Sequence, residues 1–384
     1  MQHESFFDSL AREALICARC GYCKVECPVY QELGWESASP RAKMVMAREI
    51  INGSISEKQV ERVFQCTLCG KCREVCSTSI DTVRAWQELR QHIAGCGLAP
   101  DNMKQLTATI ADHANITGDE QGNREMWLDS LDDKFKAHVG QPAEVLYFTG
   151  CSSSLYPAVY AVPQSFVQLL DLAEVSFGLL GQEEECCGFP LIGAGAFSQG
   201  KEMVQRNVRK IQKLGAKRVV TTCPSCYHTL KDTYPQVLGY ELPFDVMHAS
   251  QFLLELINQG KLELHEVRDT VTYHDPCDLG RNSGVYDAPR QVINSIPGIE
   301  FVEMPKNREY ANCCGGGGNL QAVDGDLVER IGLRRVLEGQ ATGAKTLLSS
   351  CQQCKRTLQN AARKHKVRIR VQDLTELVLK SAKP

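Results

Sequence analysis

The stretch Val145-Leu-Tyr-Phe-Thr-Gly-Cys151 opens a pattern of five cysteines that decides the fold, because the chain contains this pattern twice. The first copy continues with Cys186-Cys187-Gly188 and Cys223-Pro-Ser-Cys226. The second copy has the same order at nearly constant intervals, in Val271-Thr-Tyr-His-Asp-Pro-Cys277, Cys313-Cys314-Gly315 and Cys351-Gln-Gln-Cys354. A repeat of this kind indicates internal duplication of one structural unit.

Short apolar runs alternate with helical patterns around both copies, which favours α/β units. The predicted strands are 144–148, 175–179, 218–222, 244–247, 271–274, 301–303, 346–349 and 367–371. The predicted helices include 200–214, 250–259, 287–295, 324–338 and 352–365. Cys151, Cys223, Cys277 and Cys351 each come shortly after a predicted strand. Because ligand sites collect at the carboxyl ends of strands in open α/β sheets, the five cysteines of a copy are expected to converge.

Composition bounds the class of protein. The chain has 384 residues, 43% apolar and 23% charged, which suits a protein of two to three domains. Its net charge of −3 gives no electrostatic basis for binding nucleic acid or an anionic membrane. The uncharged window from Val145 to Leu170 contains Gly150 and two prolines, so it is predicted to be core and not a direct membrane span. Met1-Gln-His-Glu4 lacks the features of a signal peptide, which predicts a cytoplasmic protein that reaches a membrane only through a partner.

The cysteine count points to metal binding. There are 19 cysteines, an odd number, in a chain with no export signal. Disulfides are disfavoured in the cytosol, so clustered cysteines there are predicted to be metal ligands. Eight lie near the N-terminus, five lie in each copy of the repeat, and Cys96 is left over. Cys96 is interpreted as a packing residue.

The eight N-terminal cysteines form two runs with the Cys-x2-Cys-x2-Cys-x3-Cys spacing of bacterial ferredoxins. The runs are Cys17, Cys20, Cys23 and Cys27, followed by Pro28, and Cys66, Cys69, Cys72 and Cys76, followed by Ser77. Three thiolates of a run bind one [4Fe–4S] cluster, and the fourth reaches the other cluster. One cluster is therefore predicted on Cys17, Cys20, Cys23 and Cys76, and the other on Cys66, Cys69, Cys72 and Cys27. Two zinc sites are the alternative, but zinc sites usually show two separated Cys-x2-Cys pairs.

The predicted fold is α+β, with a helical double-cluster ferredoxin-type domain over residues 1–100 and two duplicated α/β domains over 143–262 and 263–384. Helix signals separate the two ferredoxin runs, since Ser39-Pro40 is a helix start and Ser56-Glu-Lys-Gln59 is a capping box. Residues 101–142 are polar and irregular. They are predicted to form a linker or a partner-facing surface without chemistry of its own.

Each copy of the repeat offers one thiolate more than a cubane cluster uses. An unusual polynuclear iron site is predicted in each copy, and the alternative is that one cysteine per copy is structural. A phosphate-binding loop at Gly315-Gly-Gly-Gly318 is rejected because Asn319-Leu320 follows it in place of Lys-Ser or Lys-Thr. His228 and His274 are close in sequence to these cysteines, so each is either a proton donor to a leaving thiolate or a structural side chain.

The spacings Cys-x34-Cys-Cys-Gly-x34-Cys-x2-Cys at 151–226 and Cys-x35-Cys-Cys-Gly-x35-Cys-x2-Cys at 277–354 resemble the CCG domain of heterodisulfide reductases. With the ferredoxin runs in front, roughly residues 10–375 resemble the D-type subunits of heterodisulfide reductases, which are fusions of C-type and B-type subunits. The resemblance implies two cubane [4Fe–4S] clusters and two non-cubane [4Fe–4S] clusters. The implied ligands of the non-cubane clusters are Cys151, Cys186, Cys187, Cys223 and Cys226 for the first, and Cys277, Cys313, Cys314, Cys351 and Cys354 for the second.

In that family the two non-cubane clusters flank the disulfide of coenzyme M and coenzyme B, and each takes one sulfur as two electrons split the bond. The ten CCG cysteines are accordingly the expected catalytic residues. The chain departs from the family at Asp278, where a histidine often follows the first cysteine of the second motif. A proton donor of that kind is therefore missing here.

Two functions remain open. The chain either passes electrons from a partner to a disulfide, or acts as an electron relay, as similar chains do in class II benzoyl-CoA reductase complexes. Related subunits of glycolate, lactate and glycerol-3-phosphate oxidoreductases commonly lose CCG cysteines, whereas this chain keeps all ten, which favours the reductase. A zinc-stapled interaction protein is a distant third. No flavin or nicotinamide fingerprint is visible, so a flavoprotein, haem or further iron–sulfur partner of an anaerobic complex is expected to supply the electrons.

Overall fold

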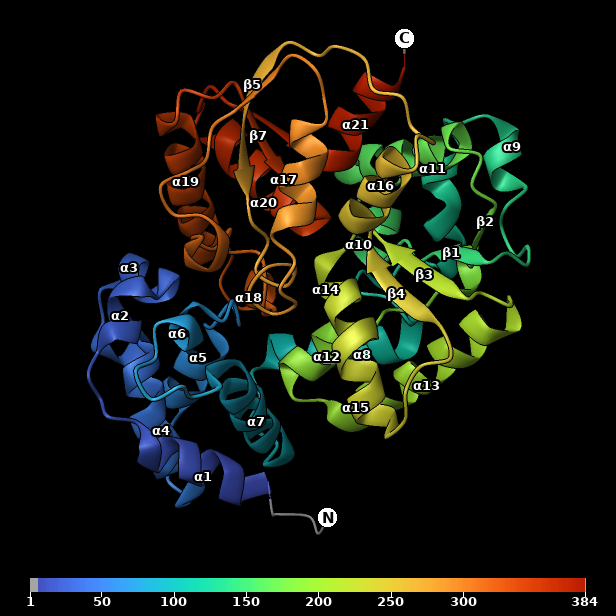
Figure 1. The fold of residues 1–384 in the computed structure, drawn as a ribbon. Coiled ribbons are helices and arrows are strands. Elements are labelled where there is room, and N and C mark those ends of the chain that lie inside the picture. The colour runs from blue at the N-terminus through green and yellow to red at the C-terminus, as the bar shows by residue number, and fades with distance from the viewer. Residues whose placement is uncertain (1–5, 384) are drawn as a thin grey trace.

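A computed structural model describes residues 6–383, so residues 1–5 and 384 of the first and last predicted domains lie outside the described part. The N-terminal region consists of short helices (Figure 1). They are α1 (Phe6–Ile16), α2 (Tyr22–Glu26), α3 (Pro28–Leu33), the 3-10 turn η1 (Glu36–Ala38), α4 (Pro40–Ile51), α5 (Glu57–Phe64), α6 (Lys71–Glu74) and α7 (Thr82–Gly95).

Side-chain caps set the starts of the middle helices, as predicted. Ser39 Oγ accepts a hydrogen bond of 3.1 Å from the Ala42 amide, and Pro40 is the first residue of α4. Ser56 and Gln59 form the reciprocal capping box of α5. Caps satisfy amide groups that a helix start leaves without partners. They therefore fix where α4 and α5 begin, in the segment between the two cysteine runs.

Residues 101–142, predicted to be a polar linker or partner-facing surface with some helix, contain α8 (Asp101–His113), the 3-10 helix η2 (Gln121–Leu128) and α9 (Asp133–Lys136). Their polar residues cover the outer surface. Trp127, Leu128 and Phe135 are buried and join the same apolar cluster as the first sheet. The apolar residues are too few and too widely spaced to give a periodic sequence signal, and tertiary packing orders the segment.

Each copy of the cysteine pattern lies on its own parallel four-stranded sheet, and all eight predicted strands are present. The first sheet has the order β2-β1-β3-β4 and the second β6-β5-β7-β8, so corresponding strands occupy corresponding places. The strands are β1 (Val145–Tyr147), β2 (Phe177–Leu179), β3 (Arg218–Thr221), β4 (Asp245–His248), β5 (Asp269–His274), β6 (Ile299–Phe301), β7 (Thr346–Ser349) and β8 (Arg370–Asp373). The shared strand order confirms the duplication.

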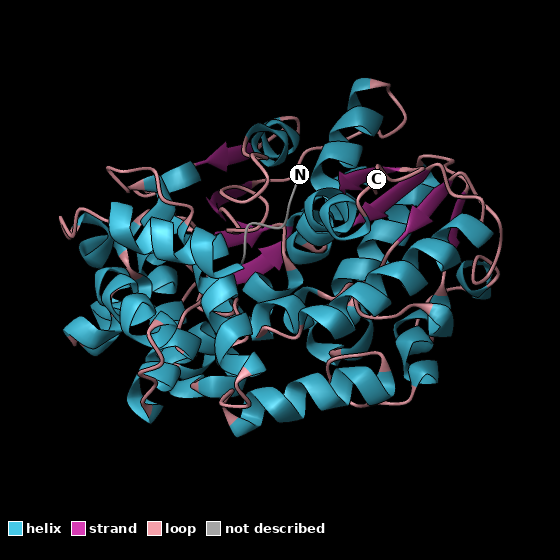
Figure 2. Cartoon of the chain, turned by 90° about the horizontal axis from the view of Figure 1, so that it is seen from below, coloured by secondary structure: helices cyan, strands magenta, loops and turns pink. Residues whose placement is uncertain are grey.

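Helices surround the strands of both sheets (Figure 2). In the first repeat they are α10 (Cys151–Leu155), η3 (Pro157–Val159), α11 (Ala161–Leu172), η4 (Gly181–Glu183), α12 (Phe189–Ala194), α13 (Phe197–Lys213), α14 (Pro224–His228), the π-helical turn η5 (Thr229–Thr233), α15 (Tyr234–Leu238) and α16 (Ala249–Asn258). In the second repeat they are α17 (Asp287–Asn294), η6 (Arg308–Tyr310), α18 (Leu320–Val323), α19 (Gly325–Ala341), α20 (Gln352–Lys364) and α21 (Leu374–Ala382). Within residues 6–383, no helix combines the length and the apolar character that crossing a membrane needs.

The two repeats share one hydrophobic core. Helix α11 of the first repeat packs on α21 of the second, and α16 of the first packs on α17 of the second. Phe166 and Phe252 from the first repeat lie in the same buried cluster as Val292 and Leu377 from the second. Because α11 corresponds to α17 and α16 to α21, the packing is reciprocal. The repeats therefore face each other about an approximate two-fold axis.

Candidate metal centre

The carboxyl-terminal ends of the two sheets meet where the repeats face each other. Ser225 Oγ, between Cys223 and Cys226, donates a hydrogen bond of 2.6 Å to Asp278. Gln352 Nε2, next to Cys351, donates to Ser153 Oγ at 2.6 Å. These side chains are buried or half-buried. Residues beside the cysteines of one repeat thus contact residues beside the cysteines of the other.

The five cysteines of the first repeat converge in a buried group. Hydrogen bonds between neighbouring thiols shift their pKa values, and these bonds join Cys151 to Cys186, Cys186 to Cys187, Cys187 to Cys226 and Cys226 to Cys223. The pKa of Cys187 falls to about 6 because its hydrogen bonds with Cys186 and Cys226 favour the thiolate. All five side chains are buried.

The second repeat shows the same chain of contacts in the same order, from Cys277 to Cys313, Cys314, Cys354 and Cys351. The Sγ atoms of Cys314 and Cys354 are 3.2 Å apart. The amides of Gly315 and Gly316 donate to the sulfurs of Cys313 and Cys314 at 3.2 and 3.4 Å. Five adjacent soft thiolate donors suit a polynuclear iron–sulfur group better than a single four-coordinate zinc ion, so the donor set fits an iron–sulfur cluster in each repeat.

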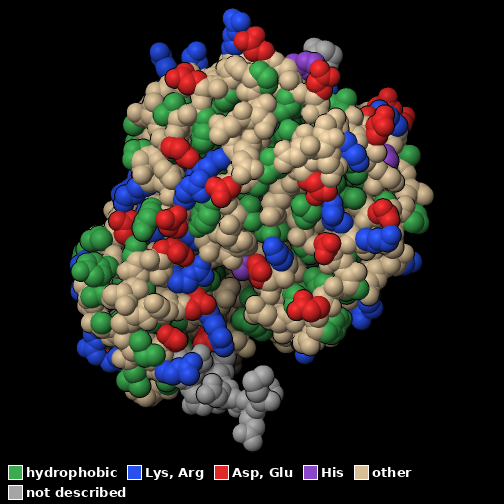
Figure 3. All heavy atoms as spheres, in the orientation of Figure 1, with side chains coloured by type: hydrophobic (Ala, Val, Ile, Leu, Met, Phe, Trp, Pro, Cys, Tyr) green, Lys and Arg blue, Asp and Glu red, His purple; other side chains and the backbone are tan. Residues whose placement is uncertain are grey.

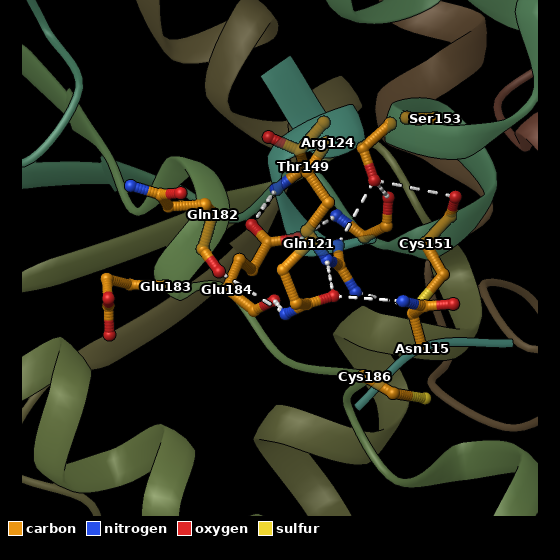
Figure 4. A network of polar contacts seen from close by, with 12 residues as sticks. Asn115, Gln121, Arg124, Thr149, Cys151, Ser153, Gln182, Glu183, Glu184 and Cys186 are labelled. Atoms are coloured by element: carbon orange, nitrogen blue, oxygen red, sulfur yellow. Dashed lines mark hydrogen bonds and ion pairs between the residues drawn. The ribbon is translucent and has the colours of Figure 1, made fainter. Parts of the chain in front are cut away.

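A buried arginine from η2 supports the first group of cysteines (Figure 4). Arg124 Nη2 lies 3.1 Å from Cys151 Sγ, and Arg124 Nη1 forms an ion pair of 3.0 Å with Glu184. Glu184 also accepts hydrogen bonds from the amides of Thr149 and Gly150. Burial lowers the pKa of Arg124, but the charges of Cys151 and Glu184 more than reverse this, so its pKa stands above the ordinary value.

Arg124 is a functional residue that sequence reasoning missed, since residues 101–142 were predicted to carry no chemistry. A single arginine in a polar segment forms no motif, so its sequence position alone does not indicate a functional role. The structure shows why it is placed there: both Arg124 and Glu184 are only 2% exposed, and a buried charge needs a partner. The positive guanidinium compensates thiolate charge at the first cysteine of the repeat.

The eight N-terminal cysteines form two neighbouring groups. Burial, together with the nearby charges of Cys17, Cys20, Cys27 and Cys76, raises the pKa of Cys23 to about 11. Burial likewise raises the pKa of Cys72, with added contributions from Cys66, Cys69 and Cys27. The neighbours of Cys72 are the other members of its predicted ligand set, whereas Cys23 lies near Cys27 of the other set as well as near Cys17, Cys20 and Cys76. The first group is the more exposed one, because Cys20 lies at the surface while Cys27, Cys69 and Cys72 are buried.

The inner N-terminal group touches the second repeat. A hydrogen bond between the Cys69 and Cys313 side chains raises the pKa of Cys69. Arg281 lies beside both, and its Nε donates to the Cys69 carbonyl at 2.7 Å. Burial lowers the pKa of Arg281, but the charges of Cys69, Cys277 and Cys313 outweigh burial and raise it. Arg281 therefore plays for the second repeat the part that Arg124 plays for the first.

The two histidines and the remaining cysteine separate in space. His274 is buried, and one of its ring nitrogens lies within 4.8 Å of the sulfurs of Cys314 and Cys354. His228 is half-buried, and its Nδ1 lies 2.9 Å from Asp232. Cys96 is exposed at the end of α7, so its interpretation as a packing residue was wrong. The end of α7 faces solvent, so other side chains do not enclose Cys96.

A cleft of about 650 Å³ opens between the N-terminal helices and the two repeats. Five of its lining residues stand within two positions of a cysteine, namely Leu68, Arg73, Phe189, His228 and Asp278. Its mouth carries charged side chains of both signs, including Arg73 and Asp232. No cysteine is among the residues that line the cleft in the described part of the chain.

Comparison with known proteins agrees with this geometry. The family described as Cysteine-rich domain matches residues 145–231 and 271–359, and the family described as 4Fe-4S dicluster domain matches residues 13–80. The chain is 35% identical to the D subunit of the dihydromethanophenazine:CoB–CoM heterodisulfide reductase of Methanosarcina barkeri, over 94% of this chain and 92% of that protein. It is 28% identical to the EtfAB:quinone oxidoreductase of Syntrophomonas wolfei, over 83% of this chain and 50% of that protein.

A solved structure shares the fold. The crystal structure of a hypothetical protein from Helicobacter pylori superimposes with a TM-score of 0.64 at 11% identity, covering 98% of this chain and 72% of that one. Fold, cysteine groups and relatives together define a class, the iron–sulfur oxidoreductase subunits with a dicluster domain and two CCG domains. Within that class, the chain belongs to the family of D-type subunits of heterodisulfide reductases.

Proposed function

We propose that this chain takes electrons from a redox partner at its N-terminal cysteines and delivers them to a disulfide between the two repeats. The observation that carries the proposal is the presence of two complete five-cysteine groups whose neighbouring residues contact each other where the two repeats meet. When bound, iron–sulfur clusters supply one-electron transfer, and a disulfide needs two electrons and two protons to give two thiols.

The proposed ligand sets follow the groups that the chain brings together. Cys17, Cys20, Cys23 and Cys76 would hold one cubane cluster, and Cys27, Cys66, Cys69 and Cys72 the other. The five cysteines of each repeat would hold one non-cubane cluster. The proposed domains are residues 1–100, 101–262 and 263–384. Residues 101–142 are joined to the first repeat because Arg124 contacts Cys151 and because their buried apolar side chains pack in the core of that repeat.

Electrons are proposed to enter beside Cys20, the exposed member of the outer N-terminal group. Several large apolar side chains nearby in sequence are exposed, among them Leu15, Tyr22, Val25 and Trp35. Hydrophobic side chains gather on this edge of the molecule (left in Figure 3), over α2 and α3. An exposed apolar patch next to a redox site suits a protein partner.

The contact between Cys69 and Cys313 supports transfer from the inner N-terminal group to the second repeat first. The cleft supports access for a substrate, because its lining residues adjoin cysteine motifs of all three parts of the chain. His228 lines the cleft and contacts Asp232 and Ser283, so it is the residue proposed to pass protons to the product thiols. Arg124 and Arg281 would compensate the negative charge of the cysteine thiolates beside them, Cys151 in the first repeat and Cys277 in the second.

An electron relay is the second candidate. It is favoured by the burial of nine of the ten CCG cysteines, all but the half-buried Cys277, and by the lack of any cysteine among the described residues that line the cleft. It is also favoured by the similarity to a quinone oxidoreductase, whose name implies no disulfide substrate.

The test is iron and acid-labile sulfide analysis of anaerobically purified protein, followed by electron paramagnetic resonance (EPR) of the oxidised protein with added thiols. We expect about 16 iron atoms per chain for four clusters of four. Coenzyme M and coenzyme B would each change the spectrum, and their heterodisulfide would yield two thiols for two electrons supplied by a viologen dye.

Matched variants locate the sites. Cys186→Ser and Cys313→Ser are each expected to lose about four irons and the thiol response of one repeat, whereas Cys96→Ser retains all the iron because Cys96 belongs to none of the groups. Full iron with spectra indifferent to every thiol and disulfide would support the relay. Zinc in place of iron would overturn both functions.

A further inference from the structure

The two repeats differ at the residue three positions before the first cysteine of each. In the second repeat this residue is His274, and in the first repeat Phe148 stands at the matching place, three residues before Cys151 as His274 is three before Cys277. Both side chains are buried, at 0% exposure for Phe148 and 1% for His274. Phe148 shares an apolar cluster with Cys187, Cys223 and Cys226.

His274 lies against the sulfurs of the second repeat. One of its ring nitrogens and the Sγ atoms of Cys314 and Cys354 lie within 4.8 Å of one another. Its Nδ1 is engaged by Arg335 Nε at 3.0 Å. Its other nitrogen, Nε2, is buried and has no hydrogen-bond partner among the described residues.

The contact with Arg335 determines the tautomer of His274. A guanidinium only donates hydrogen bonds, so the Nδ1 that faces it must be the accepting nitrogen. A neutral imidazole carries one proton, and this proton must then sit on Nε2. Nε2 is therefore an N–H donor with no lone pair left for a metal ion, which excludes His274 as a direct ligand through this atom.

Arg335 is held rigidly in this role. It is fully buried, and its Nη1 donates to Glu338 at 2.8 Å and to the Lys306 carbonyl at 3.0 Å. At the matching place on α13 the first repeat has Asn207, which donates to the Cys186 carbonyl and to Tyr234. The histidine and its arginine are thus replaced together in the first repeat, by a phenylalanine and an asparagine.

Other charged and polar contacts are balanced between the repeats. Each has a buried arginine beside its first cysteine, Arg124 in one and Arg281 in the other. Each also has backbone amides that bond to the paired cysteines, as shown by the effects of Gly188 on Cys186 and of Gly316 on Cys314. Two contacts set the second group of sulfurs apart, that of Cys313 with Cys69 and that of His274 with the Cys314–Cys354 side.

We propose that His274, oriented by Arg335, would donate its free Nε2–H to a sulfur of the cluster held at the Cys314–Cys354 side of the second repeat, and that this would give the second repeat a higher reduction potential than the first. The proposal rests on the proposed function, in that both repeats hold an iron–sulfur cluster. Reduction adds negative charge, and a hydrogen bond to sulfur stabilises the more negative state. His274 is thus a positioning and tuning residue, not a ligand.

The test compares four proteins purified anaerobically: wild type, His274→Phe, His274→Gln and Phe148→Leu. His274→Phe installs the residue of the first repeat, and His274→Gln keeps an N–H donor. Phe148→Leu is the matched control, because it alters packing at the equivalent place without adding or removing a donor. Each protein is analysed for iron, titrated electrochemically with detection by EPR, and examined by pulsed EPR after labelling with ¹⁵N-histidine.

We expect all four proteins to retain the wild-type iron content. His274→Phe should shift one centre to lower potential and leave the others unchanged, His274→Gln should recover part of that shift, and Phe148→Leu should shift none. A weak histidine nitrogen coupling should disappear in His274→Phe.

The outcomes separate this inference from the proposed function. Wild-type iron far below four clusters would overturn the proposed function itself. Full iron with an unchanged potential in His274→Phe would overturn the inference alone. A strong coupling of the kind a directly bound nitrogen gives, or loss of about four irons in both His274 variants, would make His274 a ligand and also overturn the inference.

Discussion

Asp373 places a carboxyl group inside the second repeat, at the end of β8. It is 1% exposed and caps α21, where its Oδ1 accepts from the Thr375 amide at 3.0 Å. Its Oδ2 has no hydrogen-bond partner among the residues that the structure describes. Burial raises the pKa of Asp373 to about 7, because a carboxylate without full solvation is disfavoured.

This residue makes stability depend on pH. The folded protein holds a proton on Asp373 up to about pH 7, whereas the unfolded chain loses it near pH 3.9. The folded state binds more protons between these values, so the free energy of unfolding falls as the pH rises from about 4 to 7. We expect Asp373→Asn to remove this loss and to be more stable than wild type by a few kcal/mol at pH 8.

Denaturant unfolding at pH 5 and pH 8 measures this difference. Asparagine also caps helices well, so at pH 5 the variant and wild type should be within about 1 kcal/mol. If Asp373→Asn were less stable than wild type by the same amount at pH 5 and pH 8, Asp373 would be charged in the folded protein at both pH values, and the prediction would be wrong.

At the scale of one element, the loop Gly315–Gly318 meets the loop that carries the inner N-terminal cysteines. Gly318 has a φ of 62°, and a Cβ atom there would lie 2.5 Å from the Cys66 carbonyl oxygen. Gly343 also has a positive φ, of 79°, but a Cβ atom there would meet nothing within 4 Å. A side chain would strain the backbone at either glycine, but only at Gly318 would it also collide with a neighbouring loop.

Alanine substitution at both glycines separates these effects. Gly343→Ala should cost about 1 kcal/mol of unfolding free energy from backbone strain. Gly318→Ala should cost about 2 kcal/mol more, because the loops must move apart, and it should lower the iron bound at Cys66. Denaturant unfolding and iron analysis check both. Equal costs for the two variants would show that the loops do not pack as closely as described.

At the scale of the whole molecule, Arg90 on α7 joins all three parts of the chain. It is fully buried and donates to the carbonyls of Cys66 at 2.7 Å, Gly193 at 2.8 Å and Gly318 at 2.9 Å. These acceptors belong to the N-terminal helices, the first repeat and the second repeat. Burial lowers the pKa of Arg90 to about 10, so it remains charged at neutral pH.

Arg90→Leu should cost on the order of 3 to 5 kcal/mol, because several buried carbonyls lose a charged donor. The matched control is Arg84→Leu on the same helix, because the Arg84 side chain is exposed and its ion pair with the buried Glu88 is expected to contribute only about 1 kcal/mol. Calorimetry should show one unfolding transition for wild type and separate transitions for Arg90→Leu. Equal behaviour of the two variants would contradict a joining role for Arg90.

The sequence by itself determined the parts whose signals are local. These parts are the spacing of the ferredoxin runs, the doubled CCG pattern, the eight strands, and the caps at Ser39 and Ser56. Such features depend on residues close together in the chain, or on a motif present twice. The membership of the family rested on the same spacings.

Only the tertiary structure decided which side chains support those cysteines. Arg124, Arg281 and Arg335 are single arginines in segments without a recognisable pattern, and each acquires its role from burial beside a sulfur or a histidine far away in sequence. The same holds for the ordered packing of residues 101–142 and for the exposure of Cys96. Burial and long-range contacts arise only when the chain folds, so the residues near each arginine in the sequence do not reveal which side chains will surround it.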